Sequence, residues 1–172
     1  PRIKDLGKTI KKIKINNLSE STEIFLENVI NLSKYANDFD VELLIENNVI
    51  TKSNLVSFNT NPFLMTDIDS CYYIMNNTPK NVNLLLDTGH LKVSSQTENF
   101  SKRLFIKKLN KWIKGYHISD NDGCIDSNDK INKKNFMLKY IKKNQKLYVV
   151  EVNEINCKMI KNQLSIVKNA IK

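Results

Sequence analysis

The sequence contains no apolar run that approaches the roughly 20 residues of a membrane-spanning helix. It also shows no charged-then-apolar leader ending in a small-residue cleavage site, so nothing in it indicates secretion. Cysteine is scarce: Cys71, Cys124 and Cys157 are odd in number and widely separated. This spacing fits neither a disulfide framework nor a CxxC metal clip. We therefore expect a cytoplasmic protein in a reducing environment, with no membrane partner.

Arginine is rarer still, although the chain is strongly basic. Arg2 and Arg103 are the two arginines among 27 Lys and Arg residues, and the net charge is +9. Proteins that read phosphates and bases specifically favour arginine, because its guanidinium forms paired hydrogen bonds. The lysines here are dispersed, and a compositional bias toward Lys, Asn and Ile accounts for them without a partner. We therefore do not expect a nucleic-acid partner.

Four short, continuously apolar runs stand out in the chain. Its 172 residues are enough for one domain with a real core. The runs cover residues 41–47, 82–88, 113–119 and 146–153. Apolar side chains at consecutive positions are typical of strands covered on both faces, as in parallel sheets.

Helix-like stretches alternate with these runs. The spacing of apolar residues predicts helices over residues 19–36, from a cap at Thr66 or Asp67 through Met75, and over about 98–111, 133–143 and 154–171. Strict alternation predicts parallel βαβ units with the helices outside the sheet. We therefore place a single α/β domain over residues 1–172, beginning with a poorly patterned basic segment, 1–17.

A side chain able to bind a metal stands at or near the C-terminal end of each predicted strand. These residues are Glu46, Asp87, His117 and Glu151. The carboxyl ends of parallel strands meet at one face, so we expect the four side chains to converge. Three carboxylates and an imidazole suit one Mn²⁺, Mg²⁺ or Zn²⁺ ion, which would also neutralise their charge. Each residue alone has a plainer explanation as a helix cap or loop residue. The repetition in four strands favours the metal.

The motifs around these residues resemble those of the xylose isomerase-like TIM barrels. The segments are IEN at 45–47, LLLDTGH at 84–90, HISDNDG at 117–123 and VVEVN at 149–153. That superfamily includes sugar-phosphate isomerases and epimerases and, in a divergent branch, endonuclease IV-type abasic-site nucleases. The resemblance extends over nearly all of the chain from about Ser19, and DTGH and HISDNDG are its most specific parts.

The resemblance implies that Glu46, Asp87, His117 and Glu151 bind one divalent ion, and that His90 hydrogen-bonds a substrate oxygen. In the isomerases and epimerases, the two metal-bound glutamates lie on either side of a hydroxy-ketone. One removes a proton beside the carbonyl and the other returns it, through a metal-stabilised enediolate. The implied activity is that of a divalent-metal-dependent isomerase or epimerase acting on a small sugar, sugar phosphate or hydroxy-keto acid.

Residues that would identify the substrate depart from the family pattern. Many epimerases carry a second substrate-binding acid just after the IEN segment, whereas this chain has Asn48, Val49 and Lys52 there. Several members have a substrate-binding arginine after the HISD segment, where this chain has Gly123 and Cys124. The sequence therefore does not specify which carbohydrate binds.

The nuclease branch requires further metal ligands, including an Asp-x-His after the HISD segment. This chain has Asp126, Ser127 and Asn128 at that place, and its histidines are His90 and His117. A His-rich site for three metals cannot be assembled from these residues. The missing ligands therefore weigh against the nuclease branch. Hydrolysis at abasic sites is kept as an alternative to isomerisation, and a non-catalytic half-barrel with a vestigial site is another.

The number of predicted strands is half that of a complete barrel, which has eight βα units and typically about 250 residues. We expect the C-terminal half of a TIM barrel; a small open parallel α/β sheet is the alternative. A start at Pro1, without an initiator Met, favours a fragment of a longer protein. The other possibilities are a degenerate domain and a half-barrel that pairs with a second copy or with a separate N-terminal half.

Overall fold

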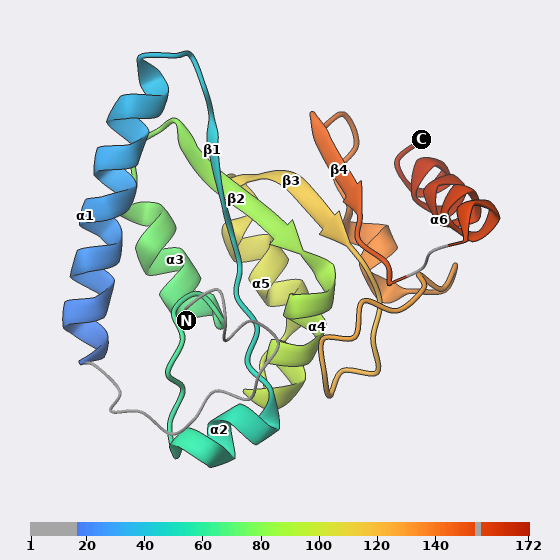
Figure 1. Cartoon of the computed structure of the whole chain (residues 1–172), viewed down its shortest axis with the longest axis horizontal. Helices are drawn as coiled ribbons and strands as arrows, with labels where there is room; N and C mark the ends of the chain where they lie inside the picture. Colours follow the sequence, from blue (N-terminus) through green and yellow to red (C-terminus); the bar gives the residue numbers. More distant parts are fainter. Residues whose placement is uncertain (1–16, 154–155) are drawn as a thin grey trace.

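The computed structural model describes residues 17–153 and 156–172, so all of the predicted segment 1–17 except Asn17 lies outside the described residues. Its centre is a four-stranded parallel sheet with the order β1-β2-β3-β4. The strands are β1 Leu43–Glu46, β2 Val82–Asp87, β3 Ile113–Ile118 and β4 Leu147–Val150. Each strand pairs with the next one along the chain (Figure 1). The predicted parallel α/β architecture is therefore confirmed, with strands one to four residues shorter than expected.

Helical segments connect and flank the strands. They are α1 Leu18–Asn37, α2 Lys52–Phe58, α3 Ile68–Asn76, α4 Thr88–Thr97, α5 Lys102–Leu109, the 3-10 helix η2 Phe136–Tyr140, and α6 Cys157–Ala170. Several begin at a side-chain cap: Asn17 accepts hydrogen bonds from the first turn of α1, and Asp67 does the same for α3. Such caps satisfy backbone N–H groups that have no partner within the helix.

Three of the predicted helices are wrong in extent, and two helices were not predicted. The expected helix over 98–111 is only α5, and α4 lies before it; α2 was also missed. The expected helix over 133–143 shrinks to the five-residue η2, because the chain there turns back to the sheet, where Lys142 N donates to Tyr116 Oη. The last helix starts at Cys157 after an Asn156 cap rather than at 154.

The main core lies on the outer face of the sheet. Leu84, Leu86 and Tyr116 point to this face, where they are buried against α3 and α5, which lie behind the sheet in Figure 1. Alternate strand residues point to opposite faces, so the opposite set lines the inner face. There, a side chain on Gly115 would press against leucines of the other strands: Leu44, Leu85 and Leu147. The strand-end ligands continue this inner row.

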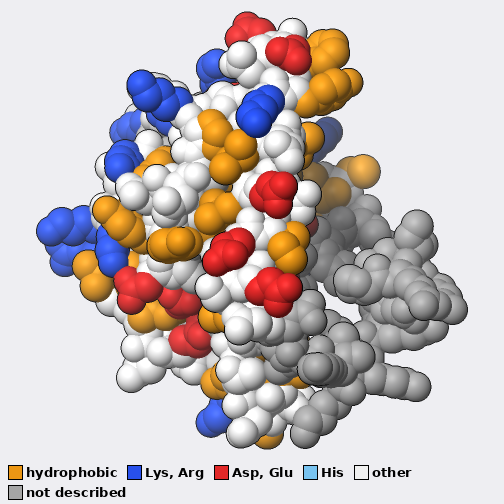
Figure 2. All heavy atoms as spheres, turned by 90° about the vertical axis from the view of Figure 1, so that its left-hand side faces the viewer, with side chains coloured by type: hydrophobic (Ala, Val, Ile, Leu, Met, Phe, Trp, Pro, Cys, Tyr) orange, Lys and Arg blue, Asp and Glu red, His pale blue; other side chains and the backbone are white. Residues whose placement is uncertain are grey.

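The β1 side of the molecule carries several exposed apolar side chains. Ile24, Leu32 and Tyr35 of α1 are exposed, and Figure 2, which faces this side, shows hydrophobic and acidic side chains interspersed over it. Among the described residues, β1 pairs with β2 alone. In a complete barrel a further βα unit would lie against this edge.

None of the helices in residues 17–153 and 156–172 is both long and apolar enough to cross a membrane. The cysteines are free thiols: Cys71 is buried in the core, and Cys124 and Cys157 are exposed.

Candidate metal centre

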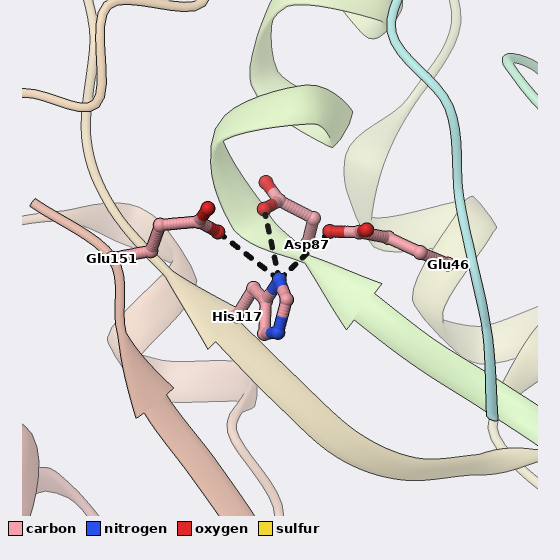
Figure 3. A group of neighbouring side chains, drawn as sticks. All are labelled: Glu46, Asp87, His117 and Glu151. Atoms are coloured by element: carbon pink, nitrogen blue, oxygen red, sulfur yellow. Dashed lines mark hydrogen bonds and ion pairs between the residues drawn. The ribbon is translucent and has the colours of Figure 1, made fainter. Parts of the chain in front are cut away.

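The predicted ligands converge at the carboxyl end of the sheet. Glu46 ends β1, Asp87 ends β2, His117 lies one residue before the end of β3, and Glu151 directly follows β4. The register pairs Asp87 with His117 across β2 and β3, which keeps the strand ends level. One potential ligand atom from each of the four residues lies within 4.8 Å of all the others. Figure 3 shows the four side chains pointing toward one another.

The imidazole of His117 lies at the centre of this group but cannot donate a hydrogen bond to all three carboxylates. Its Nδ1 is 2.8 Å from Glu46 Oε1, 3.0 Å from Glu151 Oε2 and 3.9 Å from Asp87 Oδ2. A ring nitrogen carries at most one hydrogen, so it can donate to only one of the three carboxylates at a time. The other negative charges lack a donor within the group. A divalent cation in place of that hydrogen would contact all four residues.

Asp87 supplies independent support for a cation. Its Oδ1 accepts a hydrogen bond from His90 N at 2.7 Å and caps α4, whereas its buried Oδ2 has no hydrogen-bond partner. Burial raises the pKa of Asp87 to about 6, although the positive charge of His90 limits the rise. A buried carboxylate oxygen without a donor is costly unless an ion binds it. The residues present therefore fit a divalent metal ion. Asp87 would bind this ion from the buried side of the group.

The two glutamates form the accessible side of the group. Their side chains are 36% exposed for Glu46 and 44% for Glu151, compared with 1% for Asp87. They come from the two outer strands and flank the other two residues in Figure 3. A ligand that reaches a bound ion from solvent would therefore lie between Glu46 and Glu151.

Asn47 holds the ends of β1 and β2 together beside the cluster. Its Oδ1 accepts a hydrogen bond from Asp87 N at 2.8 Å, and its Nδ2 donates to Asp87 O at 3.2 Å. The side chain is buried, so this pair of bonds fixes the backbone on which Glu46 and Asp87 stand. Sequence reasoning did not assign this role, although Asn47 belongs to the IEN segment that drew attention to Glu46.

His90 lies next to the cluster and is held by protein groups at both ring nitrogens. Nδ1 is 2.8 Å from Asn47 O, and Nε2 is 3.2 Å from Asp126 Oδ2. Burial opposes protonation of His90, but the hydrogen bonds to Asp126 and Asn47 and the charge of Asp87 outweigh it and raise the pKa to about 9. Both partners only accept hydrogen bonds, so both ring nitrogens donate. Nδ1 is also 4.0 Å from Glu46 Oε1.

Asp126 was compared with the nuclease motif, but its position beside His90 was not predicted. It lies in the loop between β3 and β4, 36 positions after His90, and no local pattern connects the two. Its Oδ1 is buried without a hydrogen-bond partner, as is Ser119 Oγ. A Cβ on Gly89 would collide with Ser119 Oγ and lie 3.3 Å from Asp126 Oδ1. The glycine of the DTGH motif thus leaves room for Ser119 and for Asp126, which contacts His90.

We expect Gly89→Ala to destabilise the protein by about 1–3 kcal/mol, the usual cost of overpacking. Helix propensity alone would favour alanine by up to about 1 kcal/mol. The sign of the change in unfolding free energy therefore shows whether overpacking or helix propensity dominates. Urea unfolding measures it, with Thr97→Ala at the other end of α4 as the control. An alanine variant as stable as the wild type would show that Gly89 and Ser119 are not packed together.

Comparisons with known proteins agree with the fold. No protein-family model and no curated protein matches the sequence. A crystal structure from Rhodospirillum rubrum, of a protein provisionally named a xylose isomerase, matches with a TM-score of 0.63 and 18% sequence identity. The match covers 89% of this chain and 54% of that one. The chain therefore shares the fold of part of this neighbour, in agreement with the predicted α/β architecture, and spans about half of the neighbour's length.

Proposed function

We propose that this chain forms the metal-binding part of a divalent-metal-dependent isomerase or epimerase that acts on a small sugar, sugar phosphate or hydroxy-keto acid. The observation that carries the proposal is the convergence of Glu46, Asp87, His117 and Glu151. The fold shared with the R. rubrum protein, whose provisional name is that of a sugar isomerase, supports it. When bound, a divalent ion would polarise a substrate carbonyl and stabilise negative charge on its oxygen.

Glu46 and Glu151 are suited to move the proton. They reach the site from opposite sides and are the most exposed members of the group. A substrate between them would present the carbon next to its carbonyl to one carboxylate, which acts as the base, while the other returns a proton. We propose these roles for the two glutamates, with Asp87 and His117 as the remaining metal ligands.

His90 is our proposed substrate-binding residue. Its side chain is partly exposed, but both of its ring nitrogens already have partners. The Nε2–Asp126 contact, at 3.2 Å, is the longer of the two. A substrate oxygen would therefore take the place of Asp126 at Nε2, while the Asn47 carbonyl keeps the ring in place.

We also infer that the sheet functions within a larger assembly, as a homo-oligomer or with a separate N-terminal half-barrel. Leu44 and Leu147 face the inner side of the sheet, and Leu147 is exposed. Apolar side chains in that position fill the interior of a complete barrel. Sedimentation velocity on the purified chain would give its oligomeric state, and a monomer that keeps full activity would contradict the inference.

Solvent exchange tests the proposed reaction across several candidate substrates at once. The protein with Mn²⁺ is incubated in D₂O with a panel of ketoses, ketose phosphates and hydroxy-keto acids, and NMR follows deuterium at the carbon beside the carbonyl. We expect exchange with at least one compound, and its loss in Glu151→Gln. A metal-loaded protein that exchanges none of them but nicks an abasic duplex would replace this proposal with the nuclease alternative.

Metal affinity is expected to fall as the pH drops below about 6. The pKa of Asp87 is raised from 3.8 to about 6, so below that value the carboxyl group is protonated and a metal must displace its proton. Above it, Asp87 is already ionised, and its contribution to the pH dependence disappears. Calorimetric titration with Mn²⁺ from pH 5 to pH 8 measures this. An affinity that stays constant over this range would show that Asp87 is not a ligand.

A further inference from the structure

A cavity that shares no lining residue with the four proposed metal ligands opens beyond the C-terminal end of β3. Its volume is about 280 Å³. It is lined by residues of α4, α5, η2 and the β3–β4 connection: Lys92, Lys102, Asp120, Asn132, Lys134, Asn135, Phe136 and Met137. Lys92 follows His90 by two residues, and Asp120 follows His117 by three, so the cavity borders the same end of the sheet as the cluster.

The lining carries a net positive charge. Its acidic residue, Asp120, is paired with Lys92 at 2.6 Å between Asp120 Oδ1 and Nζ, and Lys92 Nζ also contacts Asn121 O. That pair is internally neutral. The ammonium groups of Lys102 and Lys134 have no carboxylate partner among the described residues, and Lys102 Nζ lies 5.9 Å from the centre of the Phe136 ring. Two cationic groups are therefore left for a ligand.

The uncharged polar residues of the lining also offer donors. Asn132 Oδ1 accepts a hydrogen bond from Lys134 N at 2.9 Å, and Asn135 Oδ1 accepts one from Met137 N at 2.8 Å. These bonds use the amide oxygens and fix the orientation of both side chains. In the part of the chain that the structure describes, neither amide NH₂ group has an acceptor. The free groups of the cavity are thus two ammonium ions and two amide donors.

We propose that this cavity binds a phosphate group. A phosphate monoester carries about −1.5 to −2 charges at pH 7 and three strong acceptor oxygens, which match the two free lysines and the two amide groups. The volume lies just below the roughly 300–1,000 Å³ of sites that enclose a whole ligand. It suits a phosphate and the few atoms attached to it. Phe136 provides an apolar wall beside the charged groups.

The experiment titrates the full chain with inorganic phosphate at low ionic strength and follows backbone amide signals by NMR. Removing both free charges in a Lys102→Gln/Lys134→Gln double variant should weaken binding by about tenfold or more, because hydrogen bonds to charged groups are the strong ones. Lys161→Gln/Lys168→Gln on α6 changes the net charge equally and should shift the affinity less than about twofold. No binding by the wild type, or an equal loss in the α6 variant, would overturn the proposal.

A second arm identifies the source of the phosphate. Binding of a ketose phosphate to the Mn²⁺-loaded protein is compared with that of inorganic phosphate. Tighter binding of the ketose phosphate, lost in Lys102→Gln/Lys134→Gln, identifies a phosphorylated substrate; equal binding identifies free phosphate. Ketose phosphate binding that the double variant leaves unchanged would contradict a phosphate site here. The inorganic phosphate titration needs no metal, so its result is independent of the proposed isomerase activity.

Discussion

Replacing Asp87 with asparagine is expected to abolish divalent-metal binding and at the same time to stabilise the metal-free protein. Asparagine keeps the shape of the side chain and the oxygen that caps α4, but it removes the charge on the unpartnered Oδ2. Changes in residues that only orient metal ligands already lower affinity about 10–100-fold. We therefore expect a loss of more than about 100-fold for this ligand, measured by calorimetric titration with Mn²⁺.

The gain in stability follows from the direction of the pKa change. A carboxyl group whose pKa rises on folding from 3.8 to about 6 favours the folded state when protonated, and that contribution is lost as the pH rises through 6. The difference corresponds to about 3 kcal/mol. Asp87→Asn should recover up to this amount at pH 8 and little at pH 4.

The matched control is Asp38→Asn at the exposed end of α1, which changes the net charge equally. It should alter neither metal affinity nor the unfolding free energy by more than about 0.5 kcal/mol. An Asp87→Asn protein that binds Mn²⁺ as the wild type does would remove Asp87 from the site. A variant less stable than the wild type at pH 8 would show that the Asp87 carboxylate has a stabilising partner in the folded protein.

Replacing Phe105 with alanine is expected to cost about 3–5 kcal/mol of unfolding free energy, the usual range for a large aromatic residue in a core. Phe105 is fully buried in the hydrophobic core, and its ring stacks on that of Phe100 with the ring centroids 6.0 Å apart. The side chain belongs to the same buried core as Leu84 and Leu86 of the sheet, so its loss leaves a cavity in that core. Urea unfolding at pH 7 measures the change.

Leu104 provides the control on the same helix. It precedes Phe105 but is 52% exposed, so Leu104→Ala should cost well under 1 kcal/mol. Equal costs for the two variants would mean that α5 does not pack into the core through Phe105.

The strands and the convergence of the four candidate ligands could be predicted from the sequence. The strands have a strong local pattern, and the position of the ligands follows from a simple rule of parallel sheets. Consecutive apolar residues mark β2 and β3 as buried strands, and parallel strands place their carboxyl ends side by side. Once the strands are placed, this rule brings Asp87 and His117 to the same edge, and the register in the structure pairs the two residues directly.

The helix α4 could not be predicted from its pattern. Thr88, Gly89, Ser94 and Ser95 are poor helix formers, and residues on several sides of this helix are buried. A helix buried on several sides shows no polar face, so its sequence lacks the 3.6-residue alternation of apolar and polar positions. The opposite error occurred over 133–143, where apolar spacing indicated a helix but contacts with the sheet end it after one short 3-10 segment.

The positions of Asp126 and Asn47 beside the site could not be predicted for a different reason. Asp126 reaches His90 from an irregular loop that is closed by an isolated antiparallel bridge between Asp120 and Asp129. The contact at 3.2 Å depends on how this loop folds back toward α4. Asn47 is part of the IEN segment, but its role could not be predicted, because its two hydrogen bonds to the Asp87 backbone depend on the register of β1 against β2.

Crystals of the protein soaked with Mn²⁺ and measured by anomalous diffraction test the central claim most directly. We predict one strong anomalous peak per chain, with oxygen or nitrogen atoms of Glu46, Asp87, His117 and Glu151 about 2.0–2.3 Å away, as for first-row metal ions bound by such ligands. The absence of a peak at saturating metal, or a peak bound by other residues, would contradict it.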